Sequence, residues 1–247
     1  MASELAPEAV RPVGVALIGV GAWGKNLARN YTQLPGAVLR RICDANPDRL
    51  RDAAANYPRA ICGQEYTAVL ADPEVEAVVV AANAAAHFAL ARQALMAGKD
   101  VYVEKPLTLD VAEAAELVRL ADERSRILMV GHLLIHHPVV VKLRDLIKSG
   151  EPGRVLYVYR QRLNLGAVRE DENALWSLAP HDISSILFML DEEPTDVAAR
   201  GQCFVRRGIE DVVFMTMTFG GHALAHVHVS WLDPHKIRRI TVVGSRK

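Results

Sequence analysis

Residues 13–24 read VGVALIGVGAWG, an apolar run rich in β-branched residues that passes directly into a glycine-rich turn. Gly19, Gly21 and Gly24 have GxGxxG spacing, and a helical stretch follows them. In a dinucleotide-binding turn the first glycine permits the tight turn, the second lets the backbone approach a pyrophosphate, and the third lets helix and strand pack closely. The start of the helix then offers N–H groups to the phosphates. The motif predicts a dinucleotide site formed by Gly19, Gly21, Ala22, Trp23 and Gly24.

An acidic residue ends the next predicted strand, Val38–Asp44, and indicates which dinucleotide is bound. Asp44 lies about 20 residues beyond the glycines. A carboxylate at this position accepts hydrogen bonds from both ribose hydroxyls and repels a 2′-phosphate. Ala45 and Asn46 follow it, and neither is an arginine. We therefore expect NAD rather than NADP. The same turn also approaches the P-loop pattern GxxxxGK, but Asn26 stands where a P-loop needs a hydroxyl for Mg²⁺.

Composition indicates a globular protein: of 247 residues, 51% are hydrophobic and 23% are charged. The 29 basic residues equal the 29 acidic ones, so neither nucleic acid nor an anionic membrane is an expected partner. The apolar stretch 77–91 is interrupted by polar residues and is not expected to span a membrane. The N-terminus lacks a signal-peptide layout. Three separate cysteines without a CxxC motif fit a cytoplasmic protein with no disulfide or metal site.

The fold class follows from the alternation of short strands and helices in the first 150 residues. This alternation predicts right-handed βαβ units and a doubly wound parallel sheet, an α/β Rossmann domain. The predicted strands are Val13–Val20, Val38–Asp44, Arg59–Cys62, Ala77–Ala82, Asp100–Glu104 and Arg126–Val130. The predicted helices are Lys25–Leu34, Pro47–Asn56, His87–Gly98, Val111–Arg124 and Pro138–Ser149.

Strands predominate beyond a turn at Gly150–Gly153, which predicts an α+β region with a mostly antiparallel sheet. We assign residues 1–131 to the NAD-binding domain and 132–247 to a domain for substrate binding and oligomerisation. Gly220-Gly221 has the form of a hairpin turn. The last strand leaves an uncovered edge, for which a truncated chain or a partner subunit is the expected explanation. The predicted strands are Arg154–Leu163, Asp196–Val205, Asp211–Phe219, Ala223–Trp231 and Ile237–Val243, with one helix at Pro180–Leu190.

Lys105 is the candidate base, because Glu104-Lys105-Pro106 follows a strand at the carboxyl edge where open α/β sheets bind ligands. Oxidising an alcohol requires that the hydroxyl proton leaves as hydride goes to the nicotinamide. The ordinary pKa of lysine is about 10.4, whereas a useful base has a pKa near about 7–8. Burial and the positive charge of oxidised nicotinamide both shift the pKa of an amine downward.

Five elements together resemble the Gfo/Idh/MocA oxidoreductase family: Gly19–Gly24, Asp44, His87, Glu104–Pro106 and Trp176–Asp182. The segments ARNYTQLPGA, YRQRLNLG and ALWSLAPHDIS are similar to those of bacterial dehydrogenases that act on UDP-N-acetylglucosamine or its uronate for surface polysaccharide synthesis. The resemblance implies an NAD-dependent enzyme that oxidises the 3-hydroxyl of such a nucleotide sugar. It also implies a homodimer or homotetramer.

The resemblance assigns a role to each matching residue. Lys105 would be the acid/base and touch the nicotinamide ribose, which Glu104 would help to hold, and the Lys105–Pro106 bond would be cis. Asn83 and His87 would line the cofactor. His181 would hydrogen-bond the reacting sugar. By our own interpretation His181 lies in the first turn of a helix, which disfavours imidazolium and fits a neutral partner.

The chain departs from the family pattern at two places. Ser177 stands where many relatives have an aspartate four residues before the histidine, so an Asp–His relay is unavailable and Lys105 carries the proton chemistry. Ala82-Asn83 replaces the Thr-Pro that ends the fourth strand in relatives.

Arg162 and Asn164 alternate with apolar residues on one strand, and an arginine is a natural bidentate partner for a diphosphate or carboxylate. They are therefore candidate substrate-binding residues, although a polar sheet face would give the same pattern. Lys236, Arg238 and Arg239 could serve the same anion.

Other interpretations remain open. Three histidines, His222, His226 and His228, share one strand face, but no carboxylate or cysteine at ligand spacing accompanies them, and we expect no metal there. A free sugar or inositol could replace the nucleotide sugar as substrate. A non-catalytic dinucleotide-binding regulator is the third hypothesis.

Overall fold

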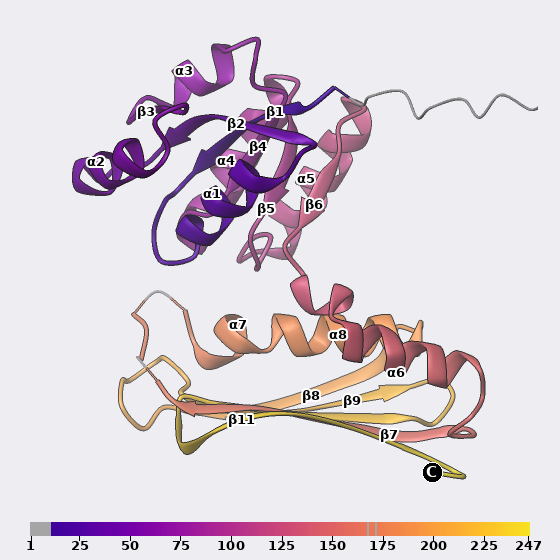
Figure 1. Ribbon diagram of the computed structural model, residues 1–247. Helices are drawn as coiled ribbons and strands as arrows, with labels where there is room; N and C mark the ends of the chain where they lie inside the picture. The colour runs from indigo at the N-terminus through magenta and orange to yellow at the C-terminus, as the bar shows by residue number, and fades with distance from the viewer. Residues whose placement is uncertain (1–10, 167, 171) are drawn as a thin grey trace, which may run out of the picture. The chain divides into compact units, whose positions relative to one another are not determined.

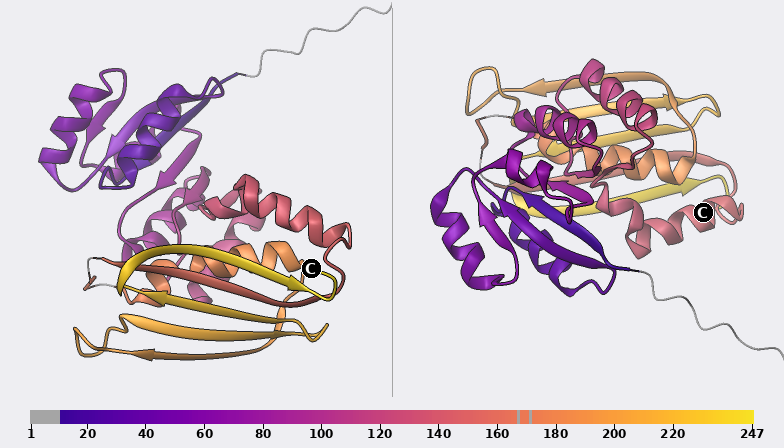
Figure 2. Two further views of the ribbon diagram at one scale, coloured as in Figure 1. Left: turned by 60° about the horizontal axis from the view of Figure 1, so that its bottom comes forward. Right: turned by 90° about the horizontal axis from the view of Figure 1, so that it is seen from above.

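The structure is a computed structural model that describes residues 11–166, 168–170 and 172–247 (Figures 1 and 2). The N-terminal segment interpreted above as lacking a signal peptide lies outside these residues. The chain divides into two units, Met1–Gly131 and His132–Lys247, each built around its own sheet. The search for a helix with the length and apolarity of a membrane span, made over the described residues, finds none.

The first unit contains a six-stranded sheet in which all pairs are parallel, which confirms the predicted doubly wound sheet. Its spatial order is β3-β2-β1-β4-β5-β6, so the chain reverses direction across the sheet between β1 and β4. In such a sheet, ligands bind outside the carboxyl ends of the strands at that switch point. The strands are β1 (Val13–Ile18), β2 (Ala37–Cys43), β3 (Ile61–Gly63), β4 (Ala77–Val80), β5 (Asp100–Val103) and β6 (Leu128–Val130).

Helices cover both faces of this sheet, which explains why β1 and β4 are continuous apolar runs. Buried side chains of α1 and α2 belong to one core cluster, and those of α3, α4 and α5 belong to the other. The sequence analysis did not predict α3, a six-residue helix too short to show a clear periodicity. The helices are α1 (Gly24–Gln33), α2 (Pro47–Asn56), α3 (Tyr66–Ala71), η1 (Ala84–Ala86), α4 (His87–Met96) and α5 (Val111–Glu123).

The second unit contains a five-stranded sheet of order β11-β7-β10-β9-β8, in which only the β7–β10 pair is parallel. The prediction of a mostly antiparallel sheet is thus confirmed, and Gly220-Gly221 lies in the connection between β9 and β10 as expected. Figure 2 shows β11, in yellow, running beside β7. The strands are β7 (Val155–Leu165), β8 (Pro194–Gln202), β9 (Val212–Phe219), β10 (Leu224–Ser230) and β11 (Leu232–Gly244).

Helices of the second unit gather on one face of its sheet (Figure 1). Their buried side chains share a core with alternate residues of β7, β9 and β10, including Val158, Met217 and Val227. The turn at Gly150–Gly153 lies inside this unit, between α6 and β7. The helices are η2 (Leu133–His136), α6 (Pro138–Lys148), α7 (Ala174–Leu178) and α8 (Pro180–Leu190).

Candidate functional site

The glycine-rich turn connects β1 to α1, and its geometry depends on two of its glycines. Gly19 has a φ of +90°, a conformation that residues with a side chain rarely adopt. A Cβ at Gly24 would lie 2.0 Å from the carbonyl oxygen of Gly19, so any larger residue would push strand and helix apart. By contrast, a Cβ at Gly21 would find Arg49 Nη1 as its nearest neighbour, at 3.7 Å. The backbone at Gly21 can therefore be approached closely, as the pyrophosphate of a dinucleotide requires.

Asp44 lies directly after β2, and the turn itself holds its carboxylate in place. Oδ2 accepts a hydrogen bond from the Val20 amide at 2.8 Å, and Oδ1 accepts one from the Asn46 amide at 2.8 Å. The residue is 7% exposed, so the carboxylate is fixed beside the glycine turn before any ligand arrives. This is the position at which an acid recognises the ribose of NAD.

The structure places a cation beside Asp44 that the sequence analysis missed. Arg49 Nη1 lies 3.6 Å from Asp44 Oδ2, because Asn46 caps α2 and Arg49 belongs to the first turn of that helix. No arginine directly follows Asp44 in the sequence, so this contact was not predicted. An arginine in the first turn of the following helix is the signal that could have revealed it.

We expect Asp44→Asn to shift the cofactor preference toward NADP by about tenfold or more, because Arg49 can then form a charge-assisted bond with a 2′-phosphate. The measurement is the ratio of kcat/KM for NADP to that for NAD. The double variant Asp44→Asn/Arg49→Gln should lose this gain. Equal ratios in the single and double variants would show that Arg49 does not contact the cofactor.

Glu104 follows β5 and connects the end of that strand to the glycine-rich turn. Its Oε1 accepts hydrogen bonds from Trp23 Nε1 at 2.8 Å and from the Tyr102 hydroxyl at 2.9 Å. Burial and the nearby Glu104 carboxylate both raise the pKa of Tyr102, which therefore remains a hydrogen-bond donor. Trp23 belongs to the glycine-rich turn, so Glu104 holds that turn to the end of β5. Neither this bond nor the part played by Tyr102 was predicted from sequence.

Lys105 lies beside Glu104, and its backbone amide donates to Glu104 Oε2 at 3.3 Å. The Lys105–Pro106 bond is cis, as the family resemblance implied. Lys105 is half-buried, and it lies just beyond the carboxyl end of β5, an inner strand of the sheet. The position suits a group that must reach a ligand bound at this edge.

His87 holds the two loops that follow β4 and β5. It is 2% exposed, and its ring nitrogens lie 2.7 Å from the Pro106 carbonyl oxygen and 3.1 Å from that of Ala82. Asn83 is exposed at the start of η1. The predicted contacts of His87 and Asn83 with the cofactor stay predictions, but the backbone of the Lys105–Pro106 segment clearly depends on His87.

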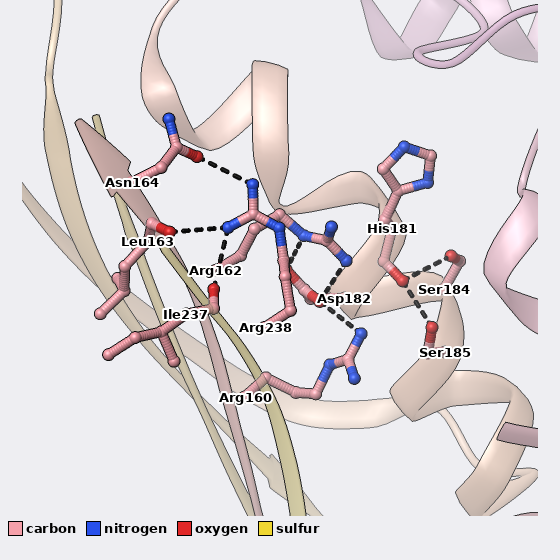
Figure 3. A network of polar contacts seen from close by, with 10 residues as sticks. All are labelled: Arg160, Arg162, Leu163, Asn164, His181, Asp182, Ser184, Ser185, Ile237 and Arg238. Carbon is pink, nitrogen blue, oxygen red and sulfur yellow. Dashed lines mark hydrogen bonds and ion pairs between the residues drawn. The ribbon is translucent and has the colours of Figure 1, made fainter. Parts of the chain in front are cut away.

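In the second unit, His181 lies in the first turn of α8, which begins at Pro180 as predicted. Its carbonyl oxygen accepts hydrogen bonds from the Ser185 hydroxyl at 2.6 Å and the Ser184 hydroxyl at 3.2 Å. Figure 3 shows the His181 ring extending away from the carboxylate of the next residue, Asp182. Ser177, one turn earlier, is buried.

Arg162 points toward α8, where it forms a bidentate ion pair with Asp182 (Figure 3). Its Nε and Nη2 donate to the carboxylate at 2.8 and 2.9 Å. Arg160 Nη2 lies 2.5 Å from the same carboxylate. Arg162 was predicted to bind an anion, and within this structure its bidentate partner is Asp182. Neither Asp182 nor Arg160 was predicted from the sequence as a partner of Arg162.

Asn164 and Arg238 extend this group along the sheet. Arg238 Nη2 donates to Asn164 Oδ1 at 2.8 Å, and Nη1 donates to the Leu163 carbonyl at 2.7 Å. Burial lowers the pKa of Arg238 from its usual value, and the charge of Arg162 lowers it further. Burial likewise lowers the pKa of Arg160, which Asp182 counteracts and Arg162 reinforces. Several positively charged side chains therefore lie close together in one partly buried region.

These arginines line a cavity of about 500 Å³ that lies wholly within the second unit. The strands β7 and β11 form one wall, and the start of α6 and Asp182 of α8 form another. This volume is in the usual range of small-molecule sites.

The histidines of β10 take part in aromatic stacking. The His226 ring stacks on Tyr159 at 5.4 Å, and the His228 ring stacks on Phe214 at 4.2 Å. Over the residues that the structure describes, no group of three or more His, Cys, Asp or Glu side chains is arranged to hold a metal ion.

Comparisons with known proteins agree with this architecture. The model of the oxidoreductase family with an NAD-binding Rossmann fold, Gfo/Idh/MocA, matches residues 13–132, and the model of that family's C-terminal domain matches residues 140–247. A UDP-N-acetylglucosamine 3-dehydrogenase from Acidithiobacillus ferrooxidans is 32% identical over 92% of this chain and 69% of its own length. An inositol 2-dehydrogenase from Acidothermus cellulolyticus is 28% identical over 76% of this chain and 57% of its own.

Solved structures show the same fold. The crystal structure of GenD2 from gentamicin A biosynthesis, in complex with NAD, has a TM-score of 0.91 and 28% identity, covering 99% of this chain and 74% of GenD2. A structure of the Acidithiobacillus ferrooxidans 3-dehydrogenase has a TM-score of 0.84 and 29% identity, covering 95% and 75% of the two chains. This chain, an NAD-binding Rossmann domain followed by the characteristic C-terminal domain, belongs to the Gfo/Idh/MocA family of oxidoreductases.

Proposed function

We propose that this oxidoreductase uses NAD to oxidise the 3-hydroxyl of a UDP-linked 2-acetamido sugar. The observation that carries the proposal is the position of Lys105 at the end of β5, beside a glutamate that Trp23 ties to the glycine-rich turn. The choice of sugar is supported by the 32% identity to a UDP-N-acetylglucosamine 3-dehydrogenase.

In the proposed reaction each residue has one task. The chemistry that bound NAD would supply is a hydride acceptor for C3 of the sugar. The amine of Lys105 takes the proton of the 3-hydroxyl as the carbonyl forms, and it returns this proton to solvent later. His181 donates or accepts a hydrogen bond at the sugar oxygen and so orients it. Asp44 would accept hydrogen bonds from the ribose hydroxyls, and the Gly19–Gly24 turn would hold the pyrophosphate.

A free polyol such as an inositol is the second candidate substrate, because inositol 2-dehydrogenases are also relatives of this chain. The residues that would bind NAD and move the proton are the same for both substrates. The candidates differ in charge, since only the nucleotide sugar carries a diphosphate.

A substrate panel tests the proposal. The purified protein with NAD should give NADH absorbance with UDP-N-acetylglucosamine or its uronate, at a kcat/KM at least about tenfold above that with myo-inositol or free N-acetylglucosamine. Faster turnover of the free polyols would overturn the choice of substrate. NAD binding without turnover of any member of the panel would favour a non-catalytic role.

A further inference from the structure

The cavity of the second unit has a strong excess of positive charge. Its described lining includes five cationic residues, Arg160, Arg162, Lys236, Arg238 and Arg239, and one acidic residue, Asp182. We call this cavity the basic pocket. Asp182 is 1% exposed and already engages both Arg160 and Arg162, so it cannot neutralise the other cations as well.

Two of these arginines face each other across neighbouring strands. Arg238 of β11 is paired directly with Arg162 of β7, and directly paired residues of an antiparallel sheet present their side chains on the same face. Like charges in this arrangement destabilise a sheet unless something offsets them. Of these two arginines, only Arg162 forms an ion pair with Asp182. Arg238 donates to a backbone carbonyl and to Asn164, and among the described residues it has no carboxylate partner.

Arg160 supplies an independent observation. Its side chain is only 7% exposed, yet its Nε has no hydrogen-bond partner among the residues that the structure describes. A buried polar group without a partner is costly, and such groups often mark the place of a ligand. Arg160 also lines the basic pocket, so an anion bound there would lie close to this guanidinium group.

We propose that the basic pocket binds a diphosphate group, with Arg160, Arg238 and Lys236 as its principal contacts. A diphosphate offers more negative charge and more acceptor oxygens than a carboxylate, and it therefore matches several cations better. Asp182 has a positioning role, since it fixes two of the guanidinium groups before the anion arrives. The inference rests on the proposed function only for the identity of the molecule that carries the diphosphate, a UDP-linked sugar.

The pocket would act as the determinant of substrate class. A nucleotide sugar would offset the unpaired charges when it binds, whereas an inositol would leave them unpaired. Loss of Arg238 or Lys236 should therefore raise the KM for a nucleotide sugar far more than the KM for an inositol.

Calorimetric titration of the whole protein with inorganic pyrophosphate tests the pocket without any reaction. Saturating NAD keeps pyrophosphate out of the glycine-rich turn. We expect Arg238→Gln to weaken pyrophosphate binding about tenfold, and Lys236→Gln/Arg238→Gln to weaken it further. Arg200→Gln is the matched control, because Arg200 is exposed on β8, the edge strand at the other side of the same sheet. The control should bind as the wild-type protein does.

The possible results separate the pocket from the proposed reaction. Pyrophosphate binding that Arg238→Gln weakens and Arg200→Gln does not would support the pocket, even if no UDP-sugar turns over. No binding to the wild-type protein, or equal binding by the two variants, would overturn it, even if UDP-sugars are oxidised. Tighter binding of glucuronate than of pyrophosphate would overturn the diphosphate assignment in favour of a carboxylate.

Discussion

Lys105→Met is expected to lower kcat by about 10²- to 10⁴-fold, the usual contribution of a general base. Methionine occupies a similar volume and has no group that can take the hydroxyl proton. Two hydrogen bonds of the cofactor site, from the Val20 amide to Asp44 and from the Trp23 indole to Glu104, do not involve the Lys105 side chain. NAD affinity should therefore change less than kcat, by no more than the loss of one contact to the nicotinamide ribose. The measurements are NADH formation on the best substrate and calorimetric titration with NAD.

Lys148→Met provides the control for removing a lysine. Lys148 is half-exposed, and its Nζ lies 3.2 Å from a carboxylate oxygen of Asp191, an ion pair of the kind that contributes little to stability. This variant should turn over as the wild-type protein does. Full turnover by Lys105→Met on the same substrate would refute the assignment of Lys105 as the base.

Gly24→Ala should have the second large effect, on both stability and cofactor binding. The added Cβ would lie 2.0 Å from the Gly19 carbonyl oxygen. This oxygen is a backbone atom and the Cβ is bonded directly to the backbone, so neither can move aside without displacing strand or helix. Overpacking of this kind costs about 1–3 kcal/mol in free energy of unfolding. The displaced turn should also bind NAD about tenfold or more weakly. Urea unfolding and calorimetric titration measure the two effects.

Two neighbouring substitutions separate these effects. Gly21→Ala should leave the free energy of unfolding close to that of the wild-type protein, because its Cβ contacts only the end of the Arg49 side chain, yet NAD binding should weaken. Gly36→Ala should affect neither property, since no heavy atom lies within 4 Å of the added Cβ. Undiminished NAD affinity in Gly21→Ala would mean that the pyrophosphate does not lie against this turn.

Two helices were predicted with correct bounds, and a residue typical of a helix start marks the first turn of each. Pro47–Asn56 and Pro180–Leu190 were predicted with correct bounds, because proline at the first helical position marks each start. The last strand begins at Leu232, whereas the sequence predicted a start at Ile237. The register of β11 against β7 shifts between these two residues. An irregular register leaves no regular alternation that a sequence can reveal.

The local structure of the candidate site was predictable where one short segment contains the whole motif, as in the glycine-rich turn and the Glu104–Pro106 segment, whereas the roles of these residues stay predictions. It was not predictable where two distant segments meet. Arg162 and Asp182 belong to a strand and a helix that approach only in the folded unit, and the same holds for Trp23 and Glu104. The sequence shows which residues are charged, but the tertiary structure determines which residue each of them pairs with.

The bond from Trp23 to Glu104 gives the glycine-rich turn a natural optical marker. The indole donates to a buried carboxylate while the residue as a whole is 47% exposed, so its emission should respond both to the state of that bond and to anything that covers the ring. Trp176 and Trp231 belong to the other unit, and Trp231 is buried. Changes in tryptophan fluorescence on adding NAD can therefore be assigned to the turn by comparison with Trp23→Phe.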